Sequence, residues 1–409
     1  MTGDPPGERR FAFDYDPGEL RCGRGCVADL GDALADRDLD DALVVTGTNV
    51  GANRDVMDPV EAGLGERLAG VFDETSPEKY LATGLAAARR VRTAGIDAMV
   101  AVGSGSSLDV AKVASALGSH DDPRAAAERA VETGAVTVAD DGDPTPVVAV
   151  PTTLAGADLS VLGGVSLSLD PAGTPDEDIP GGGVSDGRLM PTALFYDPAL
   201  FETTPKDVLC ASAMNGFDKA VECLYSPHAT PVTDGTAVRA LSLAASGFET
   251  LPDEDMDGEN LYEAVAGVVC AQYGISTPGA YRASVIHAFG HGFNGYGIHQ
   301  GIAHGILAPH VLRYLFGEVH GRRDLLAQGL GVYDADASDA ELAERVVNAV
   351  AGVSDDLGLP SRLREIEGVS RDDFPGIAEI VAEDSFLDSA PEGLDLDTED
   401  VIGVLDEAW

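Results

Sequence analysis

Histidines gather in one short stretch of this chain, between residues 287 and 310. Imidazole side chains bind metal ions and transfer protons near neutral pH, although a single histidine is more often a core or surface residue. Five of the eight histidines stand here among glycines and beside few charges, which favours a shared site: His287, His291, His299, His304 and His310. A helix over 284–291 would put His287 and His291 one turn apart on the same face.

A second group lies on the segment Val208–Tyr225, whose apolar spacing predicts a helix. On that helix Asn215, Lys219 and Glu222 share one face, and Asp218 forms a rival pair with Glu222 at a spacing of four. A solvated charged face is the simpler interpretation. Because apolar residues occupy the other sides, we expect the charged stripe to face solvent or a cleft.

A glycine- and serine-rich turn follows the β-like run Ala98–Val102 and opens a segment of helical spacing. Backbone N–H groups at such a turn, with the positive end of a helix, can hold a pyrophosphate. The alternative is a tight strand-to-helix turn that needs glycine for its backbone alone, and the spacing departs from both G-x-G-x-x-G and the P-loop. The candidate cofactor contacts in this segment are Gly103, Ser104, Gly105, Ser106 and Asp109.

Two further strand ends add candidates for the same cofactor. The run 147–150 leads into PTTLAGADLS, whose hydroxyls lie where open α/β sheets bind nucleotides, or alternatively cap a helix. The run 42–46 ends without the acidic residue that commonly holds the ribose of NAD, and Arg54 follows, so we expect NADP(H) without excluding NAD(H). Candidate contacts from these two segments are Gly47, Thr48, Asn49, Thr152, Thr153 and Leu159.

The elements that must position these residues change character near residue 205. Before it, β-like runs alternate with helix-like ones, which predicts a parallel, Rossmann-like α/β sheet with crossover helices. After it, helical segments follow one another with few strand signals. We therefore expect an α/β dinucleotide-binding domain over 1–204 and an all-α catalytic domain over 205–409. The stretch 169–187, rich in Pro, Gly and Asp, is expected to be an exposed hairpin or lid.

The composition excludes several classes of protein. With 70 Asp plus Glu against 26 Lys plus Arg, the net charge of -44 repels phosphate backbones and anionic lipids, which disfavours nucleic-acid and membrane binding. Only four lysines occur, and this balance is typical of a salt-adapted protein. Five scattered cysteines give no disulfide framework, and no long apolar segment appears, so we expect a cytoplasmic location. The tail around 384–400 is expected to be acidic solvated surface.

Four blocks, taken in order, resemble the signature blocks of the iron-containing alcohol dehydrogenase superfamily: VGSGSSLDVAK, PTTLAGADLS, MNGFDKAVECLYS and HAFGHGFNGYGIHQGIAHGILAPHVLRY. The resemblance covers most of the chain. It implies the dehydroquinate synthase-like fold, in which a dinucleotide-binding domain faces a helical domain across a cleft that holds NAD(P) and usually Fe(II) or Zn(II). It also implies an NAD(P)-dependent oxidoreductase that acts on a small carbonyl or alcohol, and a homodimer or larger homo-oligomer.

The metal pattern of that superfamily is largely missing. Its four ligand positions fall on Asn215, Lys219, His287 and Gln300. One imidazole, two amides and a cation make a poor divalent-metal site, so we expect no catalytic metal. The alternative is a shifted site with chemically suitable ligands: Asp218, Glu222, His287 and His299.

Within the superfamily, the second and third blocks are similar to those of maleylacetate reductases, which are regarded as working without a metal, and His304 falls where those enzymes carry a further histidine. We therefore expect a metal-independent carbonyl reductase of this kind. Lys219 would take the metal's place at the substrate oxygen, with its pKa lowered by burial. His287 and His291 would form a proton relay, and His304 completes the catalytic set. The alternatives are a metal-dependent alcohol or polyol dehydrogenase, a lyase-type relative and a non-catalytic nucleotide-binding protein.

Overall fold

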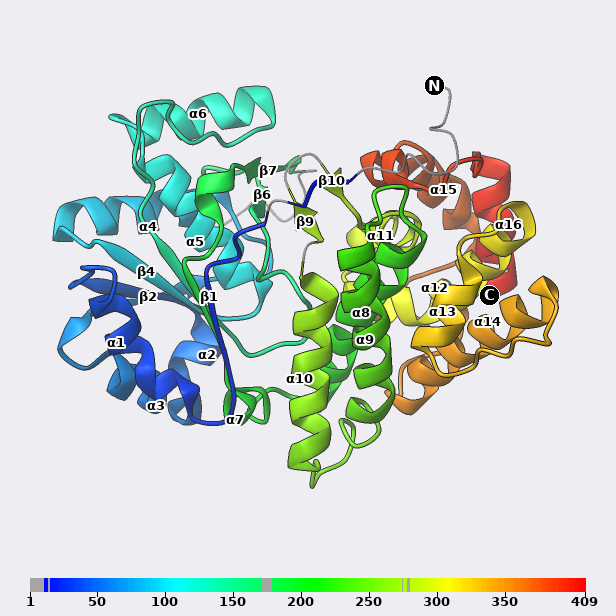
Figure 1. The fold of residues 1–409 in the computed structure, drawn as a ribbon. Coiled ribbons are helices and arrows are strands. Elements are labelled where there is room, and N and C mark those ends of the chain that lie inside the picture. The colour runs from blue at the N-terminus through cyan, green and yellow to red at the C-terminus, as the bar shows by residue number, and fades with distance from the viewer. Residues whose placement is uncertain (1–10, 14, 171–178, 274, 278–279) are drawn as a thin grey trace.

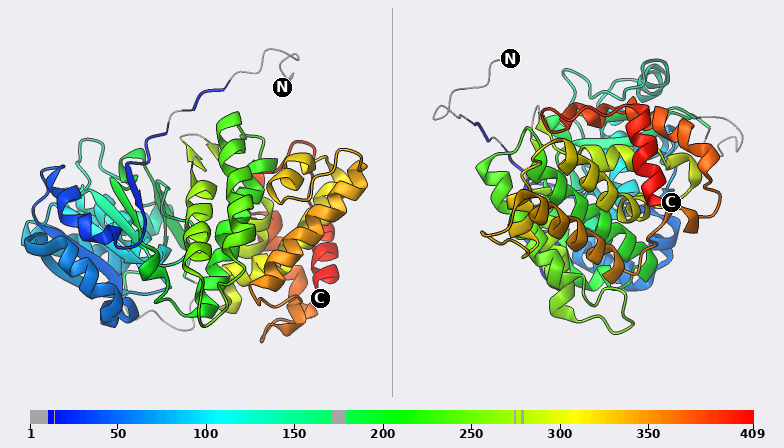
Figure 2. Two further views of the ribbon diagram at one scale, coloured as in Figure 1. Left: turned by 60° about the horizontal axis from the view of Figure 1, so that its bottom comes forward. Right: turned by 90° about the vertical axis from the view of Figure 1, so that its right-hand side faces the viewer.

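The computed structural model of the chain describes residues 11–409 apart from residue 14, residues 171–178, residue 274 and residues 278–279. The N-terminal part is a layered α/β structure, and the C-terminal part is a cluster of helices (Figure 1). The two parts lie side by side in the left-hand view of Figure 2. The change of character falls between α7 (Pro198–Phe201) and α8 (Lys206–Tyr225).

A single six-stranded parallel sheet forms the centre of the N-terminal part. Short runs rich in Val, Ala and Leu form its inner strands because both faces of such a sheet are buried. The strands, in spatial order, are β1 (Glu19–Cys22), β8 (Ala193–Tyr196), β5 (Val147–Pro151), β4 (Ala98–Gly103), β2 (Ala42–Gly47) and β3 (Leu68–Thr75). The predicted α/β class is therefore confirmed.

Helices cover both faces of this sheet. They are α1 (Leu30–Ala35), α2 (Thr48–Ala52), α3 (Arg54–Leu64), α4 (Leu81–Ala94) and α5 (Gly105–Gly118). A further helix, α6 (Pro123–Thr133), packs outside them against α4 and α5. Successive strand residues point to opposite faces. Val44 and Val100 accordingly belong to the core that includes α1 and α3, whereas Leu43 and Met99 belong to the core that includes α4 and α5.

A two-stranded antiparallel hairpin lies against α5. It consists of β6 (Leu162–Ser166) and β7 (Gly181–Ser185). The excursion expected over 169–187 is thus the connection and second strand of a hairpin that begins earlier in the chain. Residues 171–178 of that connection lie outside the described residues.

The C-terminal part is built from helices, with one small exception to the expected all-helical structure. Its further helices are α9 (Pro231–Gly247), α10 (Gly258–Gln272), α11 (Val285–His291), α12 (Gln300–Glu318), α13 (Arg323–Gly329), α14 (Asp339–Asp356), α15 (Phe374–Ala382) and α16 (Thr398–Ala408). The exception is an antiparallel pair of two-residue strands, β9 (Ser276–Thr277) and β10 (Ala280–Tyr281). A Pro-Gly sequence at 278–279 disfavours a helix here.

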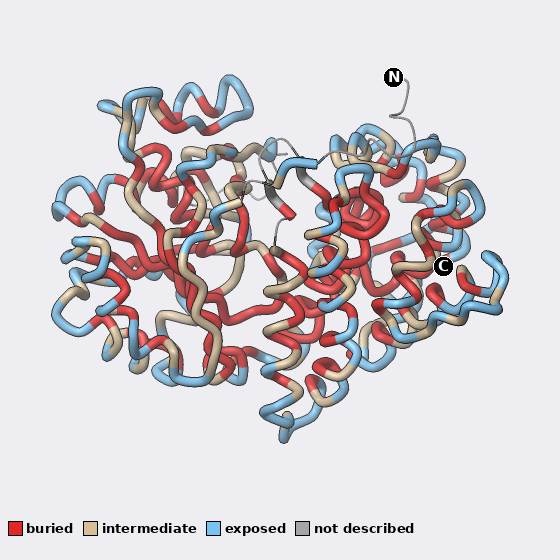
Figure 3. The backbone as a smooth tube through the Cα atoms, viewed as in Figure 1, coloured by how far each residue is buried: buried red, intermediate tan, exposed pale blue. Residues whose placement is uncertain are grey.

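Helix α8 is the central helix of the C-terminal part, packed by α9, α10 and α12. Every residue from Leu209 to Tyr225 is buried. Buried backbone, drawn red in Figure 3, fills the interior of both parts of the chain. The charged stripe of α8 therefore does not face bulk solvent, and the simpler interpretation of a solvated charged face is wrong. Neighbouring helices surround α8, so its polar groups must find partners inside the protein.

The remaining sequence expectations concern covalent links and membranes. The five cysteines are free thiols, which agrees with the absence of a disulfide framework. None of the helices in the described part of the chain combines the length and the apolar composition needed to span a membrane.

Candidate active site

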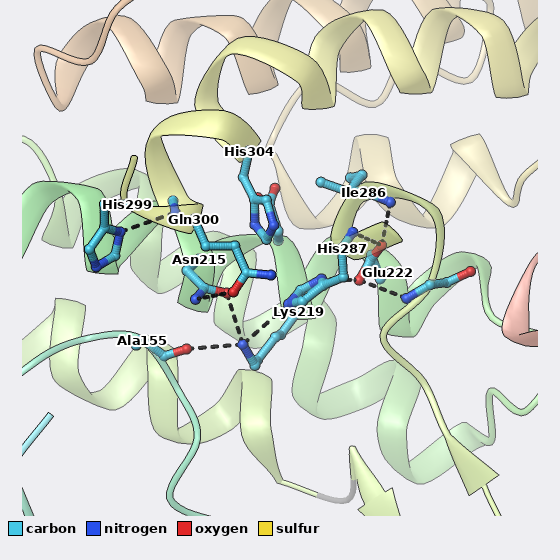
Figure 4. Close-up of polar contacts among 12 residues, drawn as sticks. Ala155, Asn215, Lys219, Glu222, Ile286, His287, His299, Gln300 and His304 are labelled. Carbon is cyan, nitrogen blue, oxygen red and sulfur yellow. Dashed lines mark hydrogen bonds and ion pairs between the residues drawn. The ribbon is translucent and has the colours of Figure 1, made fainter. Parts of the chain in front are cut away.

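The amine of Lys219 is the centre of a buried polar cluster where the two parts of the chain meet (Figure 4). Its Nζ donates to the Ala155 carbonyl and to Asn215 Oδ1, at 3.0 Å each, and lies 3.4 Å from His287 Nε2. Lys219 is 6% exposed. An ammonium has three N–H groups, so these three neighbours match its donors.

A glycine allows the loop of residues 152–160 to reach Lys219. Gly156 has a φ of +71°, and a Cβ there would lie 3.3 Å from Lys219 Cδ and 3.2 Å from Gln272 Cγ. The left-handed backbone and the close approach both favour glycine. The sequence PTTLAGADLS therefore places the Ala155 carbonyl against the helical part.

Two carboxylate–imidazole pairs lie beside Lys219. Glu222 Oε2 is 2.5 Å from His287 Nδ1. Asp218 Oδ2 is 2.9 Å from His304 Nδ1. The two imidazole rings contact edge to face with their centroids 4.6 Å apart. All four side chains are almost fully buried, so the i,i+4 spacing on α8 presents each carboxylate to one histidine.

Burial controls the protonation of this cluster. It lowers the pKa of Lys219 to about 8, against the opposing effect of Glu222 and Asp218. Burial also lowers the pKa of His304 to about 3, and burial together with the Lys219 charge holds the pKa of His287 well below its usual value. Both imidazoles are therefore neutral near pH 7, while Lys219 is positioned to exchange a proton.

His291 lies apart from this cluster. Its Nδ1 is 2.7 Å from Asp384 Oδ2, and its ring centroid is 4.9 Å from that of Phe386. Phe386 also lies 6.2 Å from the ring of His287. Asp384 is thus a partner of a candidate site residue, and its side chain is only 13% exposed, which corrects the expectation that the tail from 384 is all solvated surface.

The side chains at the expected metal positions do not fit a divalent metal. The ammonium of Lys219 stands among the groups that would otherwise be ligands, and Asn215 Nδ2 donates to Gln300 Oε1 at 3.5 Å. Only His287 offers a strong nitrogen ligand, while amides and an ammonium are poor partners for iron or zinc.

The shifted ligand set is not brought together either. Asp218 faces His304, and Glu222 faces His287. His299 is exposed, and its Nδ1 accepts a backbone N–H at the start of α12. Within the described ranges, no group of three or more His, Cys, Asp and Glu side chains is arranged to hold a metal ion.

The candidate cofactor segments meet at one edge of the sheet. Strands β2, β4 and β5 are neighbours, so their carboxyl ends lie together, where open α/β sheets bind nucleotides. Gly103 has a φ of +126°. Ser104 is the N-cap of α5, but its side chain makes no capping bond and contacts Ser106 Oγ instead, at 2.8 Å. This turn fits a phosphate because its first helical N–H groups are not capped by Ser104.

The other cofactor candidates differ in their exposure. Thr48 and Asn49 are exposed on α2, whereas Thr152 and Thr153 are buried. Leu159 is fully buried, with its backbone bonded to Gln272 Oε1 and Tyr15 Oη. The Asp109 carboxylate forms an ion pair of 2.9 Å with Lys79, and the Arg54 guanidinium forms ion pairs with two acidic residues of its own helix, Asp58 and Glu61.

Sequence reasoning missed a second polar cluster that joins the two parts of the chain. Gln272 Oε1 accepts from the backbone N–H groups of Asp158 and Leu159, at 2.7 and 3.1 Å. Its Nε2 donates to Asp158 Oδ2 and lies 3.3 Å from Tyr196 Oη. Gln272 is 1% exposed, and burial raises the pKa of Asp158 to about 6. The sequence signal that could have identified this cluster is Gln272 itself, a single amide at the otherwise apolar C-terminal end of α10.

Comparisons with known proteins agree with this architecture. The sequence profile described as "Iron-containing alcohol dehydrogenase" matches residues 17–198, and the profile "Fe-containing alcohol dehydrogenase family, C-terminal" matches residues 209–409. The chain is 28% identical to the NAD-dependent methanol dehydrogenase of Bacillus methanolicus over 381 residues, covering 90% of this chain and 93% of that one.

Other relatives match the chain at similar sequence identity and over a similar share of its length. Identity to the maleylacetate reductase of Pseudomonas aeruginosa is 25% over 405 residues, covering 98% of this chain and 97% of the relative. The solved alcohol dehydrogenase from Oenococcus oeni superposes with a TM-score of 0.85 at 22% identity, covering 97% of this chain and all of the other. The two profiles together span most of the chain, which belongs to the iron-containing alcohol dehydrogenase family.

Proposed function

We propose that this chain is a metal-independent NAD(P)-dependent carbonyl reductase in which Lys219 occupies the role of the family's metal. The observation that carries the proposal is the position of Lys219 Nζ, buried among Asn215, His287 and the Ala155 carbonyl. Relatives named as a maleylacetate reductase and an NAD-dependent dehydrogenase support a hydride transfer on a small carbonyl or alcohol.

The strand ends of the α/β part would hold the cofactor. When bound, a nicotinamide cofactor exchanges a hydride with the substrate carbon. The turn that begins α5 would bind its pyrophosphate, and the end of β2 its ribose. Residues 47–49 include no carboxylate that would repel a 2′-phosphate, which supports NADP(H). The Arg54 guanidinium, which could bind that phosphate, is paired with Asp58 and Glu61. NAD(H) therefore stays the alternative.

Lys219 would supply both positive charge and a proton at the substrate oxygen. A carbonyl oxygen gains negative charge as hydride reaches its carbon, and an ammonium beside it stabilises that charge. The substrate oxygen would replace one of the three present neighbours of Nζ, and the N–H bond that points to it then breaks while the alcohol O–H bond forms. With a pKa of about 8, this amine is a stronger acid than an ordinary lysine and is matched to neutral pH. His287 is the next group on the proton path, because its Nε2 lies 3.4 Å from Nζ. His291, the second member of the expected relay, is partly exposed and pairs with Asp384 instead.

The substrate we infer is an activated carbonyl compound of the oxoacid kind. Two arginines, Arg188 and Arg282, could also face an anionic substrate, but both side chains have partners within the protein. Arg188 pairs with Asp186, and Arg282 donates to the backbone carbonyl of His228. We therefore assign Lys219 as the cation that contacts the substrate. We also place the domain boundary at 204/205, between α7 and α8, and infer from the family resemblance a homodimer or larger assembly.

The test compares two lysines of one helix. Lys219→Ala is expected to lower kcat for reduction by about 100-fold or more, because it removes the acid and the charge at the substrate oxygen. Lys206→Ala, at the start of α8 and outside the cluster, is the matched control with unchanged kcat. Cofactor binding, measured by nicotinamide fluorescence, should survive in both variants. An unchanged kcat in Lys219→Ala contradicts the proposal.

A further inference from the structure

We propose that Glu222 is a positioning residue that holds His287 with its proton on Nδ1, so that the Nε2 lone pair faces Lys219. The inference rests on the proposed function for the direction of proton flow, but the geometry of Glu222 is independent of it.

The carboxylate of Glu222 is surrounded by donors. Its Oε1 accepts from the backbone N–H groups of Ile286 and His287, at 2.7 and 3.2 Å, and from Tyr225 Oη at 3.0 Å. Its Oε2 accepts from the Ser284 N–H at 3.0 Å and lies 2.5 Å from His287 Nδ1. Backbone N–H groups can only donate, so both oxygens must act as acceptors.

These contacts decide the tautomer of His287. Burial raises the pKa of Glu222, but the backbone N–H groups of Ser284 and His287 act against that effect and favour the carboxylate. The proton between the two side chains then belongs to Nδ1. A neutral imidazole with a proton on Nδ1 has a free lone pair on Nε2, which is the atom 3.4 Å from Lys219 Nζ.

The surrounding charges are compatible with this arrangement. The ionisable groups that face His287 are Lys219 on α8, His304 on α12, His291 on its own helix and Asp384 after α15. The Nδ1 of His304 lies 2.9 Å from Asp218 Oδ2, so its nearest carboxylate is Asp218 rather than Glu222. The carboxylate is also the acceptor for the first backbone N–H groups of α11, which fixes the helix that carries His287.

The proton step follows from the tautomer. In alcohol oxidation, the substrate O–H bond breaks and its proton joins the neutral Lys219 amine; the hydride of the substrate carbon would be taken up by a bound nicotinamide. The ammonium can pass a proton to His287 Nε2: one N–H bond breaks at Nζ and one forms at Nε2. The resulting imidazolium keeps its Nδ1–H on Glu222, whose negative charge stabilises it. Reduction runs through the same steps in reverse.

The substitution Glu222→Gln tests the tautomer, because it replaces two acceptor oxygens with one acceptor oxygen and one NH₂ donor. Placing the NH₂ on the Oε1 side would oppose two backbone N–H groups, whereas the Oε2 side would oppose only that of Ser284, so we expect it on the Oε2 side, facing His287 Nδ1. Nδ1 must then accept, and the proton moves to Nε2. A catalytic histidine held in the wrong tautomer by such an amide loses most of its activity. We therefore expect Glu222→Gln to lower kcat by about 100-fold or more and to leave cofactor binding unchanged.

The direct readout is ¹⁵N NMR of the histidine rings in the full-length protein, with His287 assigned from His287→Gln. In the unmodified protein His287 should show a protonated Nδ1 and an unprotonated Nε2, and Glu222→Gln should reverse this pattern. A protonated Nε2 in the unmodified protein overturns the proposal, even if Glu222→Gln fails to fold. This outcome is independent of Lys219→Ala, which tests the proposed function.

The matched control is Asp197→Asn. Asp197 is also a buried carboxylate that accepts backbone N–H groups, from Gly25, Val27 and Ala199, none of which belongs to the Lys219 cluster. It should lose thermal stability while keeping its kcat and the ring spectrum of His287. Glu222→Asp, which retains the charge, should preserve the tautomer and recover part of the kcat. Equal kcat in Glu222→Gln and the unmodified protein would also overturn the proposal.

Discussion

At the scale of single residues, the protonation of Lys219 sets the pH dependence of the two reaction directions. The pKa of Lys219 is lowered to about 8, so raising the pH through that value removes the ammonium. Carbonyl reduction needs the acid form and should slow as pH rises past 8, whereas alcohol oxidation needs the free amine and should speed up over the same range. Steady-state kcat measured from pH 6 to about 10 tests this, and parallel slopes for both directions would contradict it.

A second residue-scale prediction concerns the space around His304. A Cβ on Gly290 would lie 2.4 Å from His304 Nε2 and 3.2 Å from Gln300 Cγ, so Gly290→Ala must displace a site side chain. We expect a loss of about 1–3 kcal/mol in the free energy of unfolding and a lower kcat. Gly376→Ala is the control, because that helix glycine has open space at its Cβ and should gain about 0.5–1 kcal/mol. Equal thermal shifts in the two variants would refute this account of the packing.

At the scale of elements, Gln272 couples the loop of residues 152–160 to α10. Gln272→Leu removes the acceptor of the Asp158 and Leu159 N–H groups and leaves them buried, which we expect to cost about 2–4 kcal/mol. The same loop carries the Ala155 carbonyl and the hydroxyls at the end of β5, so cofactor affinity and kcat should fall together. Gln328→Leu, at an exposed position of α13, is the control. If only stability changes, the loop is held by its other contacts.

The sequence predicted the elements well because their signals are local. The runs at 42–46, 98–102 and 147–150 became neighbouring strands β2, β4 and β5, and the helix expected over 284–291 became α11. The grouping of Asn215, Lys219 and Glu222 also followed from helical spacing alone.

Other features depend on contacts between distant segments and could not be predicted in that way. The spacing on α8 did not reveal that the helix is buried on all sides, nor that Asp218 and Glu222 each face one histidine. The link from Gln272 to Asp158 spans 114 positions in the chain. No periodicity encodes such a contact, because it arises only when the two parts of the molecule pack together.

At the scale of the whole molecule, the net charge of -44 predicts a strong response to salt. Repulsion among exposed carboxylates destabilises the folded state at low ionic strength, and about 1 M salt screens it to within about 3 Å. The Tm should therefore rise as NaCl increases from about 0.1 to about 2 M. A neutral osmolyte at matched osmolality controls for changes in water activity. A Tm that stays constant or falls with NaCl would contradict the expectation of salt adaptation.

The replacement of a metal by Lys219 is tested most directly by metal content and activity on one sample. Protein purified without chelator is assayed for iron and zinc by mass spectrometry, and its turnover is measured before and after treatment with a strong chelator. We expect less than about a tenth of an equivalent of metal and unchanged turnover, since the ammonium fills the position of the ion. About one equivalent of iron or zinc, with turnover lost on its removal, would contradict the account.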